Sequence, residues 1–189
     1  MSRFASLLLA VVCLALSALP AARAEPESKI EAGFGVVDIT PDRPVPLGGY
    51  AARNGRLSEG IHDPVKARAM VVRDGDRSVG IVSVDLVGVS RDVWEAVKGK
   101  VEDLRLTVVI LAATHNHSGP GAMTDVPLWK PMTGKFDPAL RDATVEKIAE
   151  AIRLAHADLA PATLALGSTR AEGLQRNSAT EGASVDPTL

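Results

Sequence analysis

The chain has 189 residues, 46% of them hydrophobic and 3% aromatic, with 21 basic against 23 acidic side chains and a formal charge of −2. This composition is typical of a single globular unit with an aliphatic core, and it excludes collagen-like and disordered chains. The near balance of charges, with no basic run, also argues against nucleic acid as a partner.

Residues 1–24 have the pattern of a secretory signal. The apolar run from Phe4 to Leu19 follows a basic residue, and Ala22-Arg23-Ala24 forms a small-residue cleavage site. The alternative is a membrane anchor, but the run is shorter than the roughly 20 residues that span a bilayer. We predict cleavage before Glu25 and a secreted or periplasmic protein. Cleavage would remove the only cysteine, Cys13, so disulfides are not expected to stabilise the fold.

After residues 25–31, a polar stretch that predicts a mobile leader, strand patterns alternate with helical ones. Apolar and β-branched runs predict five strands in one mixed sheet, with a hairpin between the second and third, at 33–39, 66–73, 78–85, 106–112 and 162–169. Apolar residues at helical spacing predict two helices that cover the sheet, at 91–104 and 138–157. The prediction is therefore an α/β unit over residues 32–189. The final residues resemble the entry to another strand, so we expect this unit to be part of a larger domain.

The most specific chemical feature is the segment Thr114-His-Asn-His-Ser-Gly-Pro-Gly121, directly after the strand at 106–112. In an extended backbone, residues two apart point to the same side, so His115 and His117 can present both imidazoles to one point. This spacing at the carboxyl end of a strand predicts a metal site. The alternative is a pair of loop histidines that are hydrogen-bonded to the backbone.

Three other residues are candidates for the same site. His62, beside Asp63, is a possible third ligand or general base, or else a surface residue. Asp85 ends a predicted strand, where a carboxylate can orient an imidazole or cap a helix. Arg176 can hold a substrate oxygen, or can be an ordinary loop arginine. Zinc takes three or four protein ligands, so by spacing alone the site lacks ligands.

Several segments occur in the order seen at the start of the neutral/alkaline non-lysosomal ceramidases: 33–40, Gly48-Gly49-Tyr50, Gly60-Ile61-His62, Ala67-Arg68-Ala69, Ser83-Val84-Asp85-Leu86 and 114–121. The chain resembles that family over residues 32–178. The resemblance implies a zinc hydrolase domain in which the metal activates attack on the amide of ceramide, releasing sphingosine and fatty acid. It also implies ceramide or a related N-acyl lipid as partner, and contact with the membrane surface through that substrate.

The resemblance assigns roles to individual residues. His115 matches a zinc ligand, while His117 and His62 match histidines of the catalytic site. Arg176 lies near the family's arginine, although Gln175 replaces an asparagine and Asn177 intervenes before the following serine. The family's second zinc histidine, its nucleophilic serine and its later Glu and Tyr ligands have no counterpart in these 189 residues. The resemblance therefore implies that this part of the enzyme is inactive by itself.

Two other functions are compatible with the histidine pair. The first is an exported noncatalytic binding domain that keeps a vestigial His-x-His site. The second is a barrel-type metal amidohydrolase, in which such a pair follows the first strand. At least three predicted strands precede His115, which argues against the barrel.

Overall fold

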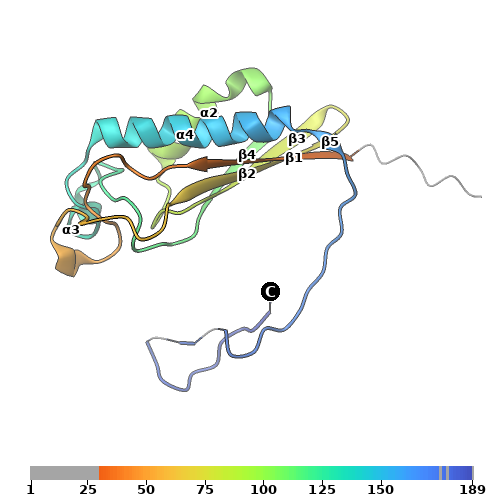
Figure 1. The fold of residues 1–189 in the computed structure, drawn as a ribbon. Coiled ribbons are helices and arrows are strands. Elements are labelled where there is room, and N and C mark those ends of the chain that lie inside the picture. Colours follow the sequence, from red (N-terminus) through yellow and green to blue (C-terminus); the bar gives the residue numbers. More distant parts are fainter. Residues whose placement is uncertain (1–29, 175, 178, 189) are drawn as a thin grey trace, which may run out of the picture.

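The computed structural model describes residues 30–174, 176–177 and 179–188, so the predicted signal and residues 25–29 of the predicted leader lie outside the described residues. One sheet carries helices on one of its faces (Figure 1). The strands are β1 Ile30–Asp38, β2 Lys66–Asp74, β3 Arg77–Val84, β4 Val108–Ala113 and β5 Ala160–Pro161. The helices are α2 Arg91–Lys100, α3 Lys130–Thr133 and α4 Pro138–Ala157, with short 3₁₀ segments η1 Ala51–Arg53, η2 Glu102–Leu104 and η3 Pro127–Trp129.

The sheet is mixed, as predicted, with the strand order β4-β3-β2-β1-β5. Strands β1, β2 and β3 are antiparallel neighbours, and β5 pairs antiparallel with β1. Strands β3 and β4 run parallel, which requires a crossover, and α2 lies in that connection. The parallel pairing places the carboxyl ends of β3 and β4 at the same end of the sheet. Asp85 follows β3 there, and the histidine segment follows β4.

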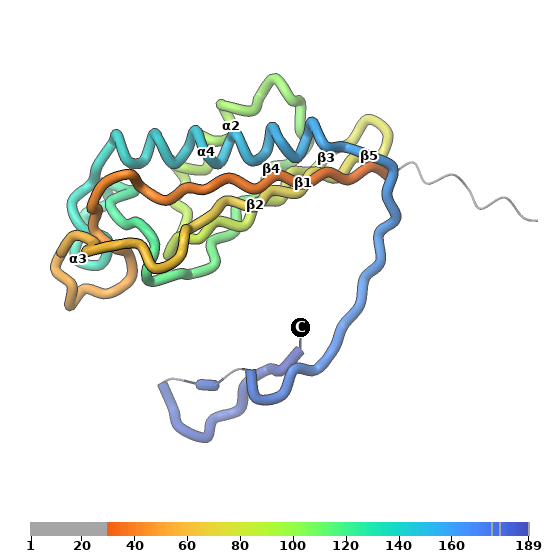
Figure 2. The backbone as a smooth tube through the Cα atoms, in the orientation of Figure 1, coloured from red at the N-terminus to blue at the C-terminus, as the bar shows by residue number. Residues whose placement is uncertain are grey.

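The first four predicted strands and both predicted helices are confirmed to within a few residues. The leader boundary was two residues too late, because Ile30 and Glu31 belong to β1 and Glu31 forms an ion pair with Arg73 of β2 at 2.7 Å. The predicted strand at 162–169 was wrong. Strand β5 has only two residues, and the chain then leaves the sheet, as Figure 2 shows. Leu164 and Leu166, which lie within the predicted strand, are exposed to solvent.

Helix α4 packs directly on β1 because two glycines of that strand face it. A Cβ atom at Gly33 would lie well under 3.0 Å from the carbonyl oxygen of Ala155, and one at Gly35 equally close to that of Ala151. The helix therefore approaches the sheet more closely than any side chain on these two strand positions would allow. Ile148 and Ile152 of the same helix are fully buried at the centre of the core.

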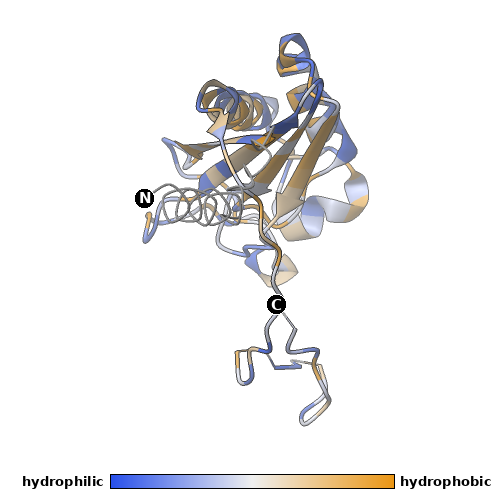
Figure 3. Cartoon of the chain, turned by 90° about the vertical axis from the view of Figure 1, so that its right-hand side faces the viewer, coloured by the Kyte–Doolittle hydropathy of each residue, from blue (hydrophilic) through white to orange (hydrophobic). Residues whose placement is uncertain are grey.

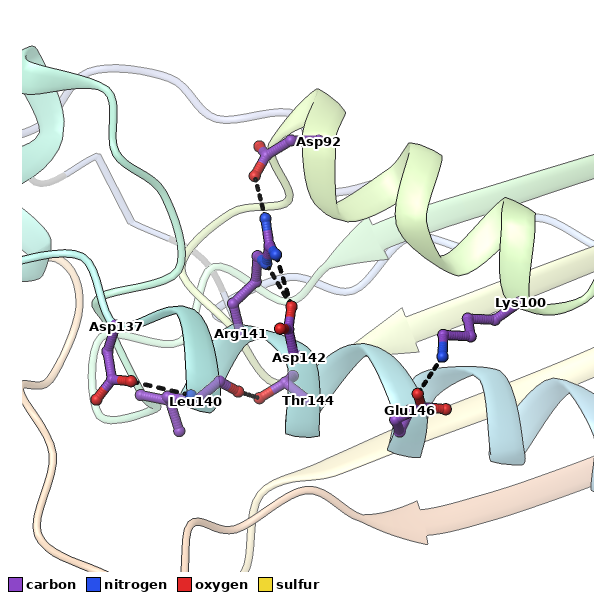
Figure 4. A network of polar contacts seen from close by, with 8 residues as sticks. All are labelled: Asp92, Lys100, Asp137, Leu140, Arg141, Asp142, Thr144 and Glu146. Carbon is purple, nitrogen blue, oxygen red and sulfur yellow. Dashed lines mark hydrogen bonds and ion pairs between the residues drawn. The ribbon is translucent and has the colours of Figure 1, made fainter.

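Ion pairs join α4 to α2 above the core (Figure 4). Arg141 contacts Asp92 of α2 at 3.8 Å and its neighbour Asp142 at 2.6 Å, and Lys100 pairs with Glu146. All of these side chains are at least a quarter exposed, so each pair adds little to stability. The two helices owe their position mainly to the apolar core beneath them.

No helix in the described part of the chain is long and apolar enough to cross a bilayer.

The other face of the sheet is apolar, and none of the helices among the described residues packs on it. Strand pairing aligns Phe34, Met70, Ile81 and Ile110 in one cross-strand row. Phe34 is 61% exposed and Ile110 45%. The strands are coloured as largely hydrophobic in Figure 3. The predicted covering by helices therefore holds for one face only.

The start of α4 predicts a measurable dependence of stability on pH. The Asp137 carboxylate accepts hydrogen bonds from the Arg43 guanidinium at 2.6 Å and from the Leu140 amide at 3.1 Å. Both bonds favour the charged form and hold the pKa of Asp137 below its ordinary value of 3.8. A lowered folded-state pKa contributes stability above the ordinary value, and this contribution is lost as the pH falls through the folded value.

We therefore expect Asp137→Asn, which keeps a capping oxygen but not the charge, to lower the urea midpoint at pH 7. The deficit relative to the wild type should shrink below about pH 3.8, where the wild-type carboxylate becomes protonated. Asp76→Asn, at an exposed position in the β2–β3 turn, is the control, with no change expected at either pH. A deficit that is constant from pH 7 to pH 3 would contradict this account.

Candidate functional site

His115 lies two residues beyond the carboxyl end of β4, on an edge of the sheet. Its backbone has φ +59°, a left-handed conformation that is uncommon for a residue other than glycine and that often marks functional sites. The side chain is exposed, and its Nδ1 lies 2.7 Å from the carbonyl oxygen of Val87. A carbonyl oxygen can only accept, so Nδ1 must carry the hydrogen. In the neutral imidazole the lone pair is then on Nε2, which points away from the backbone partner.

His117 brings its own Nε2 to the same place. The two Nε2 atoms are 3.1 Å apart, and the ring centres are 4.7 Å apart with the planes at 67°. The remaining ring nitrogen, Nδ1 of His117, is buried and has no hydrogen-bond partner in the structure.

The two histidines meet, but not by the alternation of an extended strand. Strand β4 ends at Ala113, and the left-handed backbone of His115 turns the chain before His117. The prediction that both imidazoles reach one point is confirmed, whereas the predicted extended backbone was wrong. Hydrogen bonds on both sides hold this turn, because the amides of Thr114 and Asn116 donate to the carbonyls of Val84 and Leu86 at 2.9 and 3.1 Å, respectively.

Residues 48–53 supply contacts that sequence reasoning missed. Gly49 has φ +107°, and a Cβ atom there would lie well under 3.0 Å from the ring of His117. The Tyr50 ring meets the same imidazole edge-on, at 4.6 Å between ring centres and 73° between planes. Arg53 donates a hydrogen bond to the carbonyl of His117. The available sequence signal was Gly48-Gly49-Tyr50, which carried the family resemblance but assigned no contact to these residues.

The other predicted site residues lie elsewhere. His62 contacts its neighbour Asp63 at 2.6 Å on a loop where its side chain is 98% exposed. Asp85, in place of the predicted contact with an imidazole, accepts hydrogen bonds from the Lys66 amide at 2.9 Å and from Arg68 at 3.0 Å. Arg176 is exposed in the segment after β5, which runs away from the sheet (Figure 2).

A cavity of about 880 Å³ lies beside the histidine segment. His62, Asp85, Thr114 and Asn116 line it, whereas His115 and His117 do not. The side chains therefore alternate along this segment. Thr114 and Asn116 line the cavity, and His115 and His117, which alternate with them, do not. The structure does not bring His62 and Asp85 into the imidazole pair.

The pair offers two nitrogen ligands at most. Among the residues that the structure describes, no three His, Cys, Asp or Glu side chains lie close enough together to hold a metal ion. The donor chemistry nevertheless suits zinc, because one imidazole has its Nδ1 fixed by a carbonyl and its Nε2 left as an acceptor, the arrangement common in zinc-binding histidines. A complete zinc site would need further ligands from outside this set.

The chain is similar to known proteins over most of its length. The chain is 32% identical over 158 residues to a neutral ceramidase from Mycobacterium tuberculosis, a match that covers 78% of this chain and 25% of that protein. It is also 33% identical over 184 residues to a neutral ceramidase from Pseudomonas aeruginosa, a match that covers 93% of this chain and 27% of that protein. The chain therefore spans about a quarter of the length of these relatives.

A solved structure of a ceramidase complexed with C2 has a similar fold. It superposes with a TM-score of 0.75 at 27% sequence identity, covering 85% of this chain and 28% of that one. The family model described as "Neutral/alkaline non-lysosomal ceramidase, N-terminal" matches residues 30–187, which is nearly all of the described chain. The chain thus belongs to the neutral/alkaline non-lysosomal ceramidase family.

Proposed function

We propose that this chain is the N-terminal part of a zinc-dependent amide hydrolase that acts on ceramide or a related N-acyl lipid, releasing sphingosine and fatty acid. The relatives named neutral ceramidases support the reaction class, and the structural relative complexed with C2 supports a ceramide-like ligand. Export by residues 1–24, and contact with the membrane surface through the lipid substrate, belong to the same proposal.

One observation carries the metal part of the proposal. The carbonyl of Val87 fixes the tautomer of His115, so that its Nε2 is available as a ligand at the exposed edge of the sheet. His117 lies beside it in the site, with its Nε2 3.1 Å away. When bound, a zinc ion polarises the carbonyl under attack and makes water nucleophilic at neutral pH.

This chain's own residues orient the imidazoles and leave one side of them open. His115 is exposed, so a lipid amide can approach it from solvent or from a membrane surface. The remaining metal ligands would come from polypeptide outside the described residues. His62 and Arg176 remain catalytic candidates by resemblance only, because the structure does not place them beside the pair.

The direct test is His115→Ala in the protein purified from the cells that make it. We expect zinc affinity to fall by at least about 100-fold, since loss of a mere orienting partner already costs about 10–100-fold. Hydrolysis of a fluorescent ceramide should fall to background. Zinc content is measured by plasma emission and affinity by competition with a chromophoric chelator.

His156→Ala is the matched control, because this half-buried histidine lies on α4, away from the segment that begins at Thr114. Its zinc content and activity should equal those of the wild type. If His115→Ala keeps both zinc and activity, His115 has no part in the reaction. If the wild type binds no zinc and hydrolyses no N-acyl lipid, a noncatalytic binding domain is the better account.

A further inference from the structure

The two imidazoles of the pair are held in different ways. His115 is oriented by a hydrogen bond from its own ring to the carbonyl of Val87. The ring of His117 has no such anchor, because its Nδ1 is buried without a partner in the structure and its Nε2 contacts only His115. The position of His117 must therefore come from its backbone and from the groups packed on its ring.

Arg53 contacts both the backbone of His117 and the Tyr50 ring that packs on its side chain. Its Nη1 donates to the carbonyl of His117 and, at 3.2 Å, to the carbonyl of Gly48. Its guanidinium carbon lies 4.9 Å from the centre of the Tyr50 ring, a cation–π distance. Tyr50 in turn packs edge-on against the imidazole of His117. One half-buried guanidinium thus joins the backbone of His117 to the ring that packs on its side chain.

The backbone hydrogen bonds between the two loops do not replace this contact. The amide of Gly48 donates to the carbonyl of Gly119 at 3.0 Å, and the amide of Gly121 donates to the carbonyl of Pro46 at 2.7 Å. These bonds lie two or more residues after His117. On the other side, the amide of Asn116 donates to the carbonyl of Leu86 at 3.1 Å. Between these anchors, Arg53 is the donor to the carbonyl of His117.

We propose that Arg53 is the positioning residue of the histidine pair, holding His117 so that its Nε2 faces that of His115. The inference rests on the proposed function only in that the pair is taken as the metal site. Arginine suits the task because one of its guanidinium nitrogens, Nη1, donates to both carbonyls while the planar face of the same group stacks on the Tyr50 ring. A lysine ammonium offers a single charged point and no such face.

The test compares Arg53→Met and Arg53→Lys in the full chain. The first readout needs no metal: the ¹H–¹³C and ¹H–¹⁵N shifts of the imidazoles at constant pH. We expect Arg53→Met to shift the ring signals of His117 and to leave the Nδ1 hydrogen bond of His115 in place. Arg56→Met is the matched control, because exposed Arg56 pairs with Glu59 at 2.9 Å, and it should leave both imidazoles unchanged.

The second readout is zinc affinity, measured with a competing chelator. Arg53→Met should weaken binding by about tenfold or more, and Arg53→Lys by a smaller factor, since outer partners of metal-binding histidines have effects of this size. Wild-type affinity and unshifted His117 signals in Arg53→Met would overturn the proposal, as would an equal change in Arg56→Met. If Arg53→Met does not fold, as judged by circular dichroism, wild-type affinity and shifts in Arg53→Lys overturn it.

The two proposals fail in distinguishable ways. If the wild type binds no zinc, the proposed function fails, while the imidazole shifts still decide the role of Arg53. If His115→Ala abolishes zinc binding and the Arg53 variants leave both the affinity and the His117 signals unchanged, only the inference about Arg53 fails.

Discussion

Replacing Gly35 by alanine is expected to lower the free energy of unfolding by at least about 3 kcal/mol, the upper part of the range for overpacked cores. The new methyl group would lie well under 3.0 Å from the carbonyl oxygen of Ala151 and 2.7 Å from the amide nitrogen of Ala155. Both are backbone atoms of α4, so no side chain can move aside. The helix must separate from β1, and the buried contacts of Ile148 and Ile152 with the sheet would loosen.

Gly99→Ala is the matched control for this substitution. Gly99 lies in α2, and a Cβ atom there would meet nothing within 4 Å. Because alanine is the better helix former, this variant should be as stable as the wild type or more stable, by up to about 1 kcal/mol. Urea unfolding followed by circular dichroism measures both variants. Equal midpoints for Gly35→Ala and the wild type would mean that α4 does not rest on β1 as closely as the structure shows.

This close packing explains which parts of the fold could be predicted from the sequence. Helix α4 was predicted at its observed bounds because Asp137-Pro138 marks its start and its apolar spacing is local information. The glycines of β1 carried no such signal, since their function depends on a helix more than 100 residues later. The strand at 162–169 was predicted from a local apolar run, but pairing needs a partner edge, and β1 pairs only with Ala160 and Pro161, just before this run.

The features of the site also divide into those that local sequence could predict and those that depend on distant residues. The meeting of His115 and His117 was predicted because two residues apart in one chain is a local relation. The left-handed turn that achieves it was not, since His115, with φ +59°, lies between amides that donate to the carbonyls of Val84 and Leu86, residues about 30 positions earlier in the chain. Asp85 was a reasonable candidate for orienting an imidazole, but the amide of Lys66 and the side chain of Arg68 occupy its oxygens. The carbonyl of Val87 does so instead, and a backbone group leaves no trace in the sequence.

Gly49→Ala is expected to displace the ring of His117 from the histidine pair. Alanine strongly disfavours φ +107°, and its methyl group would lie well under 3.0 Å from Cγ of the His117 ring. Backbone strain of this kind costs about 1–3 kcal/mol, and the imidazole must also move away from His115. We expect zinc affinity to fall by at least about tenfold, with large shifts in the His117 ring signals.

Gly55→Ala separates the two causes, because it also places alanine at a positive φ, +71°, while its methyl group would meet nothing closer than 3.8 Å. Both variants should lose stability in urea, since both pay for the backbone. Only Gly49→Ala should move the His117 signals and weaken zinc binding, because only there does the new methyl group displace the imidazole. If the two variants change zinc affinity equally, the effect comes from general loosening of the loop, and the close approach of Gly49 to His117 does not set the geometry of the pair.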